Sequence, residues 1–215
     1  MNTFSKSLVV GAALAASTLA TGTVLAETSA NVAVTSNYVW RGLTQTDDKA
    51  ALQAGLDWSD KNGLYAGAWA SNVDFGTDAT AEIDTYFGYS GEVNEFGYDI
   101  GYLAYNYHGE PVIDFAEFYV GGSYKMVSLT YYKNDDYDYS YTDVAADFDV
   151  SGFGIGLHYG TWGGDFEGND YSVALSKGFS GFDASLTYTS ASKDVTGTGD
   201  SESETFLTIS KGFDL

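Results

Sequence analysis

The only arginine of the 215-residue chain, Arg41, follows Tyr38, Val39 and Trp40 directly. The chain holds 9 Lys+Arg against 30 Asp+Glu, so a lone basic side chain has many carboxylates available to it. An unpaired arginine in a narrow and poorly hydrated space would be costly. We therefore expect Arg41 to pair with carboxylates inside the fold.

Catalytic and metal chemistry find little support elsewhere in the sequence. The absence of cysteine excludes disulfides, thiolate metal sites and cysteine nucleophiles. The histidines His108 and His158 are too few for a histidine-rich metal site. A phospholipase would need a serine and an orienting group beside a histidine, and no motif arranges them. We predict no catalytic residue, no metal site, no cofactor and no enzymatic activity.

Two further motifs are weak signals. Gly152, Gly154 and Gly156 lack the spacing and the following helix of a dinucleotide-binding fingerprint, and favour a crowded interior of a sheet instead. The acidic run at residues 134–138 could bind calcium through its oxygens, but it lacks the EF-hand spacing. A solvated acidic loop is the favoured interpretation.

The N-terminal residues read as a secretory signal peptide. Lys6 precedes an apolar run that begins at Leu8, and small residues end at Ala26 before Glu27. A transmembrane helix is the alternative, but Ser17, Thr18, Thr21 and Thr23 interrupt the segment. We predict cleavage after Ala26, which leaves residues 27–215 as one domain.

Composition narrows the class of that domain. The formal net charge of −21 disfavours a nucleic-acid partner. Aromatic residues make up 16% of the chain, which argues against disorder despite the excess of acid.

Apolar residues alternate with polar or small ones along nearly the whole mature chain, which is typical of half-buried strands. No segment has helical periodicity. The pattern predicts about twelve strands, each close to the ~9–11 residues that a tilted transmembrane strand needs. The expected strands are 31–41, 51–60, 64–71, 82–90, 96–105, 115–124, 127–131, 144–150, 153–159, 171–179, 182–188 and 205–215.

Short turns alternate with longer, more acidic loops. The turns are 60–63, 91–95, 124–126, 150–152 and 180–181, and the loops are 44–49, 72–80, 108–114, 134–142, 163–170 and 190–203. This arrangement favours an all-β, closed antiparallel up-and-down transmembrane barrel with short periplasmic turns and longer extracellular loops. The mature protein is thus expected to reside in the outer membrane of a Gram-negative bacterium. A soluble β-sandwich is the less favoured fold.

Successive side chains of a strand point to opposite faces of the sheet, so alternate positions of each predicted strand face the lumen (the inner parity) or the lipid (the outer parity). Arg41 falls on the inner parity, where a charge is tolerated. Its expected partners are the inner-parity carboxylates Glu82, Asp84, Glu117 and Glu204, with Glu204 nearest if the first strand pairs with the last. Inner-parity Tyr105 and His158 complete the candidates for the lumen and its constriction. The outer parity yields an aromatic girdle at the membrane surface, for which the candidates are Tyr38, Trp40, Trp58, Phe179 and Phe213.

Two strand ends repeat the residues Ser-Lys-Gly-Phe, at 176–179 and 210–213. A lysine and an aromatic residue suit the periplasmic membrane interface. The last strand keeps its apolar alternation to Leu215, which resembles the closing strand of outer-membrane proteins. We therefore expect lipid and the barrel-assembly machinery as partners.

The segment from Asn31 to Phe75 carries a more specific resemblance. Its residues 31–45 (NVAVTSNYVWRGLTQ), 54–57 (AGLD) and 63–73 (GLYAGAWASNV) resemble the TorF family of proteobacterial porins. The resemblance implies an outer-membrane barrel with a channel role, and it brings no substrate or catalytic residue.

Two functions remain open at this point. The first is a channel for passive diffusion of small solutes or ions, with a preference for cations because carboxylates dominate the mouth. The second is a structural or adhesive barrel whose lumen is plugged by side chains. About twelve strands lie between the filled eight-stranded barrels and the wide channels of 16–18 strands, so the strand count does not decide between them.

Overall fold

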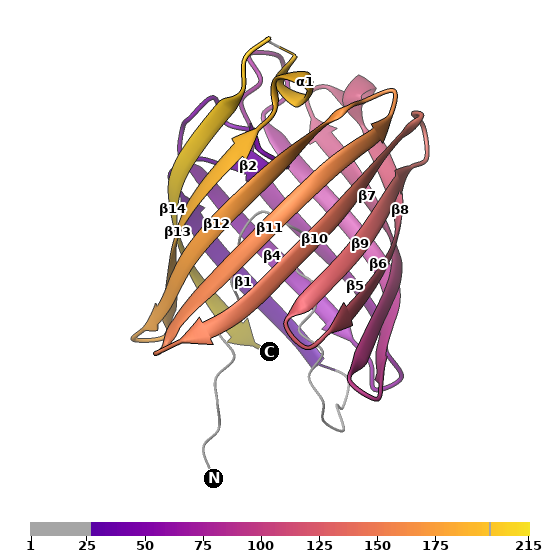
Figure 1. Ribbon diagram of the computed structural model, residues 1–215, viewed down its shortest axis with the longest axis vertical. Helices are drawn as coiled ribbons and strands as arrows, with labels where there is room; N and C mark the ends of the chain where they lie inside the picture. The colour runs from indigo at the N-terminus through magenta and orange to yellow at the C-terminus, as the bar shows by residue number, and fades with distance from the viewer. Residues whose placement is uncertain (1–26, 198) are drawn as a thin grey trace.

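The alternating segments form twelve strands of one closed, antiparallel barrel in the computed structural model, which describes residues 27–197 and 199–215. Figure 1 shows the strands inclined around the barrel. The barrel strands are β1 (Glu27–Thr35), β4 (Ala51–Ser59), β5 (Leu64–Asn72), β6 (Ala81–Val93), β7 (Phe96–His108), β8 (Phe115–Tyr124), β9 (Val127–Asn134), β10 (Tyr139–Val150), β11 (Phe153–Gly164), β12 (Gly168–Phe179), β13 (Phe182–Ala191) and β14 (Glu202–Asp214).

Closure occurs between the first and last strands. β1 pairs antiparallel with β4 on one side and with β14 on the other. The pairing with β14 runs from Ser29 opposite Asp214 to Thr35 opposite Thr208. Every barrel strand therefore has two partners, and no strand edge is left with unpaired N–H and C=O groups. The predicted all-β barrel is confirmed. The predicted signal peptide, residues 1–26, lies outside the described residues.

The outer surface of the barrel is apolar, as the parity predicts. Leu52, Phe87 and Ile100 are 65%, 61% and 57% exposed, although they are large hydrophobic residues. A continuous apolar band of this kind is stable in contact with lipid rather than water. The outward positions also include Val32, Val34, Leu56, Ile83, Val120, Leu129, Leu157, Val173, Leu175, Leu186, Leu207 and Ile209.

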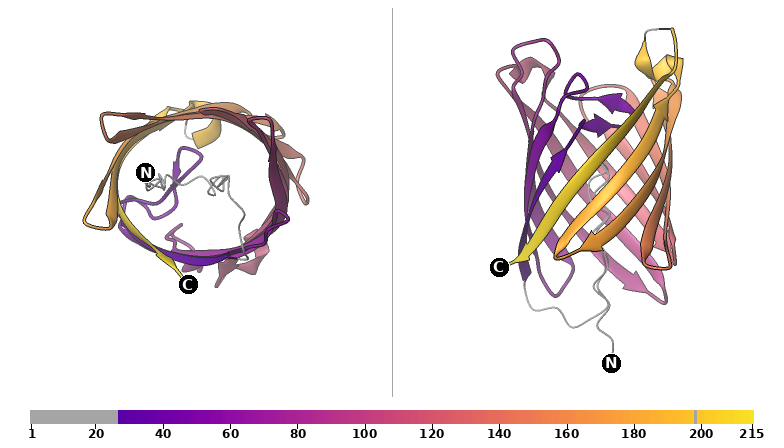
Figure 2. Two further views of the ribbon diagram at one scale, coloured as in Figure 1. Left: turned by 90° about the horizontal axis from the view of Figure 1, so that it is seen from below. Right: turned by 90° about the vertical axis from the view of Figure 1, so that its left-hand side faces the viewer.

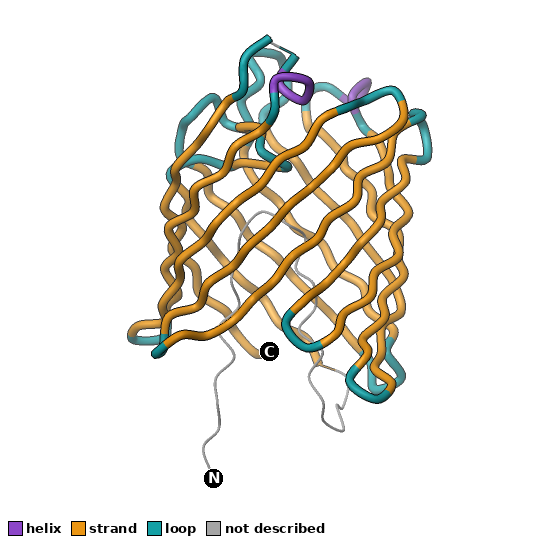
Figure 3. Tube along the Cα trace, viewed as in Figure 1, coloured by secondary structure: helices purple, strands orange, loops and turns teal. Residues whose placement is uncertain are grey.

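The two ends of the barrel differ as expected. Figure 3 shows tight turns at the end where the C-terminus lies and longer connections at the other end. Ser151-Gly152 and Ser180-Gly181 join their strands as two-residue turns with φ positive at both positions. The longer connections carry two short helices, η1 (Pro111–Ile113) and α1 (Lys193–Thr196). No helix among the described residues is long and apolar enough to cross a membrane.

The first strand is shorter than predicted. β1 ends at Thr35, whose hydroxyl donates to the carbonyl oxygen of Asn37 at 2.8 Å and so turns the chain out of the sheet. Residues 36–50 then fold into the barrel and form the hairpin β2 (Val39–Trp40) and β3 (Leu43–Thr44), as Figure 2 shows. The interpretation of residues 36–41 as the outer end of a membrane strand is therefore wrong.

Strand β10 is longer than predicted, because it already begins at Tyr139. These first residues of β10 belong to the loop predicted at 134–142, and their outward positions carry the polar Ser140 and Thr142. The inward positions hold Tyr139 and Tyr141, which are 6% and 1% exposed. This part of β10 is therefore stabilised by the burial of its tyrosine side chains inside the barrel, and not by an apolar outer face.

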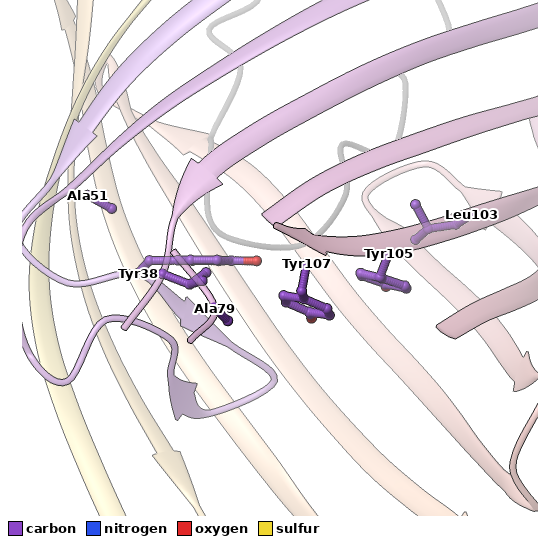
Figure 4. Close-up of a cluster of buried hydrophobic side chains, with 7 residues drawn as sticks. Tyr38, Ala51, Ala79, Leu103, Tyr105 and Tyr107 are labelled. Carbon is purple, nitrogen blue, oxygen red and sulfur yellow. The ribbon is translucent and has the colours of Figure 1, made fainter. Parts of the chain in front are cut away.

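The buried core lies inside the barrel, towards the end with the long loops. The hairpin supplies Tyr38, and strand β7 supplies Leu103, Tyr105 and Tyr107, as Figure 4 shows. Trp40, Trp69 and Phe115 pack against this cluster. The inward-folded segment therefore gives a barrel of this width an aromatic interior.

Candidate functional site: a constriction built by the inward hairpin

Residues 36–50 are held in the lumen by a compact set of hydrogen bonds. Thr46, which is fully buried, accepts from the backbone N–H of Tyr38 at 3.1 Å and donates to the carbonyl oxygen of Lys49 at 2.6 Å. The N–H of Gln45 donates to the carbonyl of Tyr38 at 2.6 Å, which joins the two arms of the hairpin. The segment is thus a folded unit rather than a loose loop.

The tip of the hairpin is the pair Arg41-Gly42. Their φ values are +48° and +83°, the sign that both central residues of a type I′ hairpin turn require. A Cβ atom on Gly42 would lie 2.8 Å from Cβ of Ala191 and 2.9 Å from Cβ of Asp170. The tip therefore touches the wall at β12 and β13, and only glycine fits there.

The tip carries Arg41 to the wall at β8. Its Nη1 and Nη2 donate to Oε1 and Oε2 of Glu117 at 2.8 and 2.7 Å, a bidentate ion pair. The side chains of Arg41 and Glu117 are 7% and 0% exposed. Tyr105 Oη also donates to Glu117 Oε2 at 3.1 Å. Both charges are compensated by direct contact, which a buried pair needs in order to be stable.

Aromatic rings surround the guanidinium. Its carbon lies 4.1 Å from the ring centroid of Tyr141, 4.9 Å from Tyr132 and 5.0 Å from Trp162. The neighbouring Trp40 contributes a fourth ring at 4.4 Å. Electron-rich faces at these distances attract a cation. Gly160 leaves room for the Tyr141 ring, since a Cβ atom there would overlap the phenol.

A second polar network continues from the arginine cage along β10, β11 and β12. Tyr141 Oη donates to Asp170 at 2.7 Å. The Nε2 atom of His158 lies 3.0 Å from Asp170 Oδ2, and its Nδ1 atom lies 3.0 Å from Asp143 Oδ2. An imidazolium, which has an N–H on each nitrogen, satisfies both carboxylates at once. The two basic groups in this part of the lumen are therefore both engaged with acids.

A third group of acids lies on β6 beside the base of the hairpin. Glu82 and Asp84 are 1% and 2% exposed. Tyr38 Oη donates to Glu82 Oε1 at 3.2 Å, and the carboxyl groups of Glu82 and Asp84 contact each other. These carboxyl groups have no basic partner comparable to Arg41.

The structure separates the seven predicted lumen residues into distinct places. Arg41, Glu117 and Tyr105 meet in one cluster, Glu82 and Asp84 lie beside Tyr38, and His158 belongs to the network on β11. Glu204 contacts the loop instead, where its Oε2 accepts from Asn37 Nδ2 at 3.4 Å. Arg41 thus pairs with one of its four expected partners, and that partner is not Glu204.

Two of the five predicted girdle residues are wrong. Tyr38 is 3% exposed and packs edge-on against Trp69 at 5.2 Å, inside the barrel. Trp40 packs against Tyr105 and Trp162 at 5.8 and 5.7 Å. Their apolar alternation continues that of β1, but the chain has left the wall before it reaches them.

The other three girdle candidates lie on the outside, at the end with the short turns. Trp58, Phe179 and Phe213 are 42%, 50% and 43% exposed. Lys211 lies 5.4 Å from the ring of Phe213, as an interfacial lysine and aromatic pair would. Their contact with lipid headgroups stays a prediction.

Sequence reasoning missed Tyr132, Tyr141, Asp143 and Asp170. All four lie just outside the ends of the predicted strands, although the structure places them on inward positions of β9, β10 and β12. Continuing the alternation beyond the predicted strand ends is the signal that finds them. Among the described residues, no group of three or more His, Cys, Asp or Glu side chains is arranged to hold a metal ion.

Comparison with solved structures gives the fold family of the barrel. A KdgM porin matches with a TM-score of 0.63 and 10% identity, covering 86% of this chain and 99% of that one. A KdgM porin in complex with disordered oligogalacturonate has a TM-score of 0.61 and 10% identity, with coverages of 88% and 99%. A NanC porin has a TM-score of 0.54 and 12% identity, with coverages of 86% and 97%. At these identities the likeness is one of fold.

Sequence comparison gives the family. No curated protein matches the sequence significantly. Neither the family description nor these structures carry the TorF name, so that resemblance stays a prediction, whereas the porin-like barrel that it implied is confirmed. The model of the family described as "Bacterial protein of unknown function (Gcw_chp)" matches residues 19–213, and the chain therefore belongs to this family.

Proposed function

We propose that the protein is an outer-membrane channel through which small solutes or ions diffuse, with a preference for cations. The observation that carries the proposal is the inward segment 36–50, which narrows a porin-like barrel beside a wall rich in carboxylates. Large loops folded inward are an effective way to set pore size without changing the number of strands.

Charge inside the barrel supports the preference for cations. Arg41 and His158 are already held by carboxylates, so neither basic group presents an unpaired positive charge to the lumen. Nearer the short turns, Asp57 and Asp99 accept hydrogen bonds from Tyr86 and Tyr65, and no ion pair of the described residues involves either carboxylate. Carboxylates in a confined space attract cations and repel anions.

The same charge argues against an acidic sugar as the solute of this chain. One similar porin holds oligogalacturonate, a polymer of uronic acid. A polyanion would meet uncompensated carboxylates in this lumen. We therefore infer small cations or neutral solutes for this chain rather than an acidic oligosaccharide.

Location and assembly follow from the same fold. The apolar outer face would contact outer-membrane lipid, and β14 would serve as the strand that the assembly machinery recognises. The predicted signal peptide would direct export. Mature protein that begins at Glu27 is the expected product.

A plugged, non-conducting barrel is the second candidate, and one observation favours it. Tyr38, Leu103, Tyr105 and Tyr107 form a buried cluster inside the barrel, against which Trp40, Trp69 and Phe115 pack. A structural or adhesive protein needs no open path. The two functions differ in whether ions pass.

Single-channel recording of the refolded protein in a planar lipid bilayer separates the two. Stepwise conductance with a reversal potential of cation-selective sign supports the channel. A correctly folded barrel that gives no steps would favour the plugged barrel. A variant without residues 38–47 provides a control, because removal of the hairpin should raise the conductance of either form.

A further inference from the structure

The guanidinium of Arg41 occupies a site that the barrel wall builds from consecutive strands. Strand β8 provides Glu117, β9 provides Tyr132, β10 provides Tyr141 and β11 provides Trp162. The guanidinium carbon lies within 5.0 Å of the centroid of each of these three rings. Four neighbouring positions on one inner face are thus directed at one cation.

The wall site has the chemistry of a guanidinium receptor. Glu117 accepts two parallel hydrogen bonds, at 2.8 and 2.7 Å, which a planar guanidinium can donate and an ammonium cannot match. Tyr105 Oη holds Oε2 of the same carboxylate at 3.1 Å. The aromatic faces suit a weakly hydrated, planar cation.

Arg41 reaches this site from the hairpin in the lumen, whereas the other groups of the site belong to strands of the wall. It lies at the tip of a two-residue turn, on a segment that the backbone connects to β1 and β4 and that is not itself a strand of the wall. The receptor and its ligand therefore belong to separate structural units. A ligand on a tether acts at a high effective concentration, but a free ligand of the same chemistry can still compete with it.

We propose that Glu117, Tyr132, Tyr141 and Trp162 form a binding site for solutes that carry a guanidinium group, and that Arg41 is its resident ligand. A guanidinium solute replaces Arg41 on Glu117 and releases the hairpin tip from β8. Binding at this site does not require conduction. Its part in solute passage rests on the proposed channel function.

The test is chemical rescue in the refolded barrel. Arg41→Ala vacates the site and leaves Glu117 buried without a basic partner. Methylguanidinium at millimolar concentration should raise the melting temperature of this variant, because a ligand that binds only the folded state stabilises it. It should also shift the tryptophan emission, because Trp40 and Trp162 lie against the site.

The controls isolate the carboxylate and the shape of the cation. Methylammonium and sodium chloride at equal ionic strength should have a much smaller effect. The double variant Arg41→Ala/Glu117→Gln should lose the response. Arg41→Ala/Glu204→Gln should retain it, because Glu204 contacts Asn37 rather than the guanidinium. An equal response to methylammonium, or one that survives Glu117→Gln, would overturn the proposal.

The wild-type protein provides a second measurement should Arg41→Ala fail to fold. Methylguanidinium should shift the tryptophan emission of the wild type as well, although only at a concentration high enough to displace the tethered Arg41. An emission that responds equally to methylammonium would again overturn the proposal. Because emission and melting temperature report binding without conduction, a barrel that binds methylguanidinium but passes no current refutes only the channel.

Discussion

At the scale of single residues, Arg41 and Glu117 form a buried, bidentate ion pair between the hairpin tip and the wall. Removing one partner of a buried ion pair leaves an uncompensated charge and typically costs about 3–5 kcal/mol. We expect Arg41→Ala to lower the free energy of unfolding by about this amount. Urea unfolding of the refolded barrel, followed by tryptophan emission, measures the change.

The double variant provides the control for this prediction. Arg41→Ala/Glu117→Ala should cost less than the sum of the two single changes, because the second substitution removes the orphaned charge. Lys49→Ala should have a small effect, since Lys49 is 62% exposed and pairs with Asp74 in solvent. Additive costs at Arg41 and Glu117 would mean that the two side chains do not interact in the folded barrel.

Asp74 gives the inner segment a dependence on pH. Its pKa is lowered from the ordinary 3.8, chiefly because Lys49 donates to its carboxylate at 2.7 Å. A lowered folded-state pKa means that this stabilisation is complete above the unfolded value and is lost as pH falls through the folded one. The backbone contact from the Asp74 N–H to the Gln45 carbonyl, 2.9 Å long, should therefore loosen in acid.

Hydrogen exchange at the Asp74 amide, followed across the acidic range, measures this loosening. Asp74→Asn should give fast exchange at every pH and remove the acid transition. High salt should weaken the transition, because the contact lies in solvent and is screened. A transition that persists in Asp74→Asn would assign the effect to another carboxyl group.

At the scale of elements, the parity of the strands predicts unequal effects at neighbouring positions of β11. Leu157 points outward and His158 points between Asp143 and Asp170. Arginine on the lipid face costs about 2–4 kcal/mol near the midplane, whereas arginine at position 158 meets two acids. Leu157→Arg should therefore impair assembly far more than His158→Arg, measured as the folded fraction recovered in membranes. Equal recovery would contradict the register of β11.

The hairpin itself can be dislodged at its tip. Gly42→Val would place a branched side chain at φ +83° and within contact distance of Ala191 and Asp170. We expect the tip to leave the wall, which lowers thermal stability and raises conductance. Asp47→Asn, on the same inward segment, should change conductance less, because the side chain of Asp47 is 73% exposed and pairs with Lys49 rather than with the wall. A conductance that is the same in Gly42→Val and wild type would mean that the hairpin does not narrow the path.

The sequence predicted the barrel strands well and the inner segment poorly, for a physical reason. Leu52, Phe87 and Leu157 alternate with small or polar residues, because alternate positions of a barrel strand face the apolar lipid and the confined lumen. Tyr38 and Trp40 keep the same alternation inside the lumen, where burial against Trp69 and Tyr105 also favours aromatic residues. Parity alone does not distinguish lipid from an aromatic interior.

The choice of Glu117 as partner was unpredictable for a related reason. The four candidate carboxylates share one parity and one half of the barrel, and strand order alone favours Glu204, whose strand pairs with β1. Selection depends on how far the hairpin crosses the lumen, which the turn at Arg41-Gly42 determines. The signal for that turn was present, since a glycine directly after Arg41 permits two consecutive positive φ values.

At the scale of the whole molecule, ion selectivity is the sharpest expectation. The lumen holds more carboxylates than basic groups, so a salt gradient should give a reversal potential of cation-selective sign at low salt. The preference should weaken as salt rises. Arg41→Ala frees Glu117 and should make the channel more cation-selective. Anion selectivity in the wild type, or a folded Arg41→Ala variant that loses cation preference, would contradict the assigned charges.

Fractionation of the native host tests location. Mature protein that begins at Glu27 should be recovered with outer-membrane markers and should resist extraction by salt. Recovery from the soluble periplasm would contradict the membrane assignment of the apolar face.

The hairpin also has a mechanical consequence. A barrel wall is one backbone layer thick, and such a thin shell resists stretching along its hydrogen bonds better than flattening across its width. The segment leaves the wall between β1 and β4, grips β8 through Arg41 and abuts β12 and β13 through Gly42. The segment therefore acts as a transverse brace. It connects strands on different sides of the barrel, which the hydrogen bonds between neighbouring strands do not connect directly. Without the brace, the cross-section of the barrel would fluctuate between rounder and more elliptical shapes.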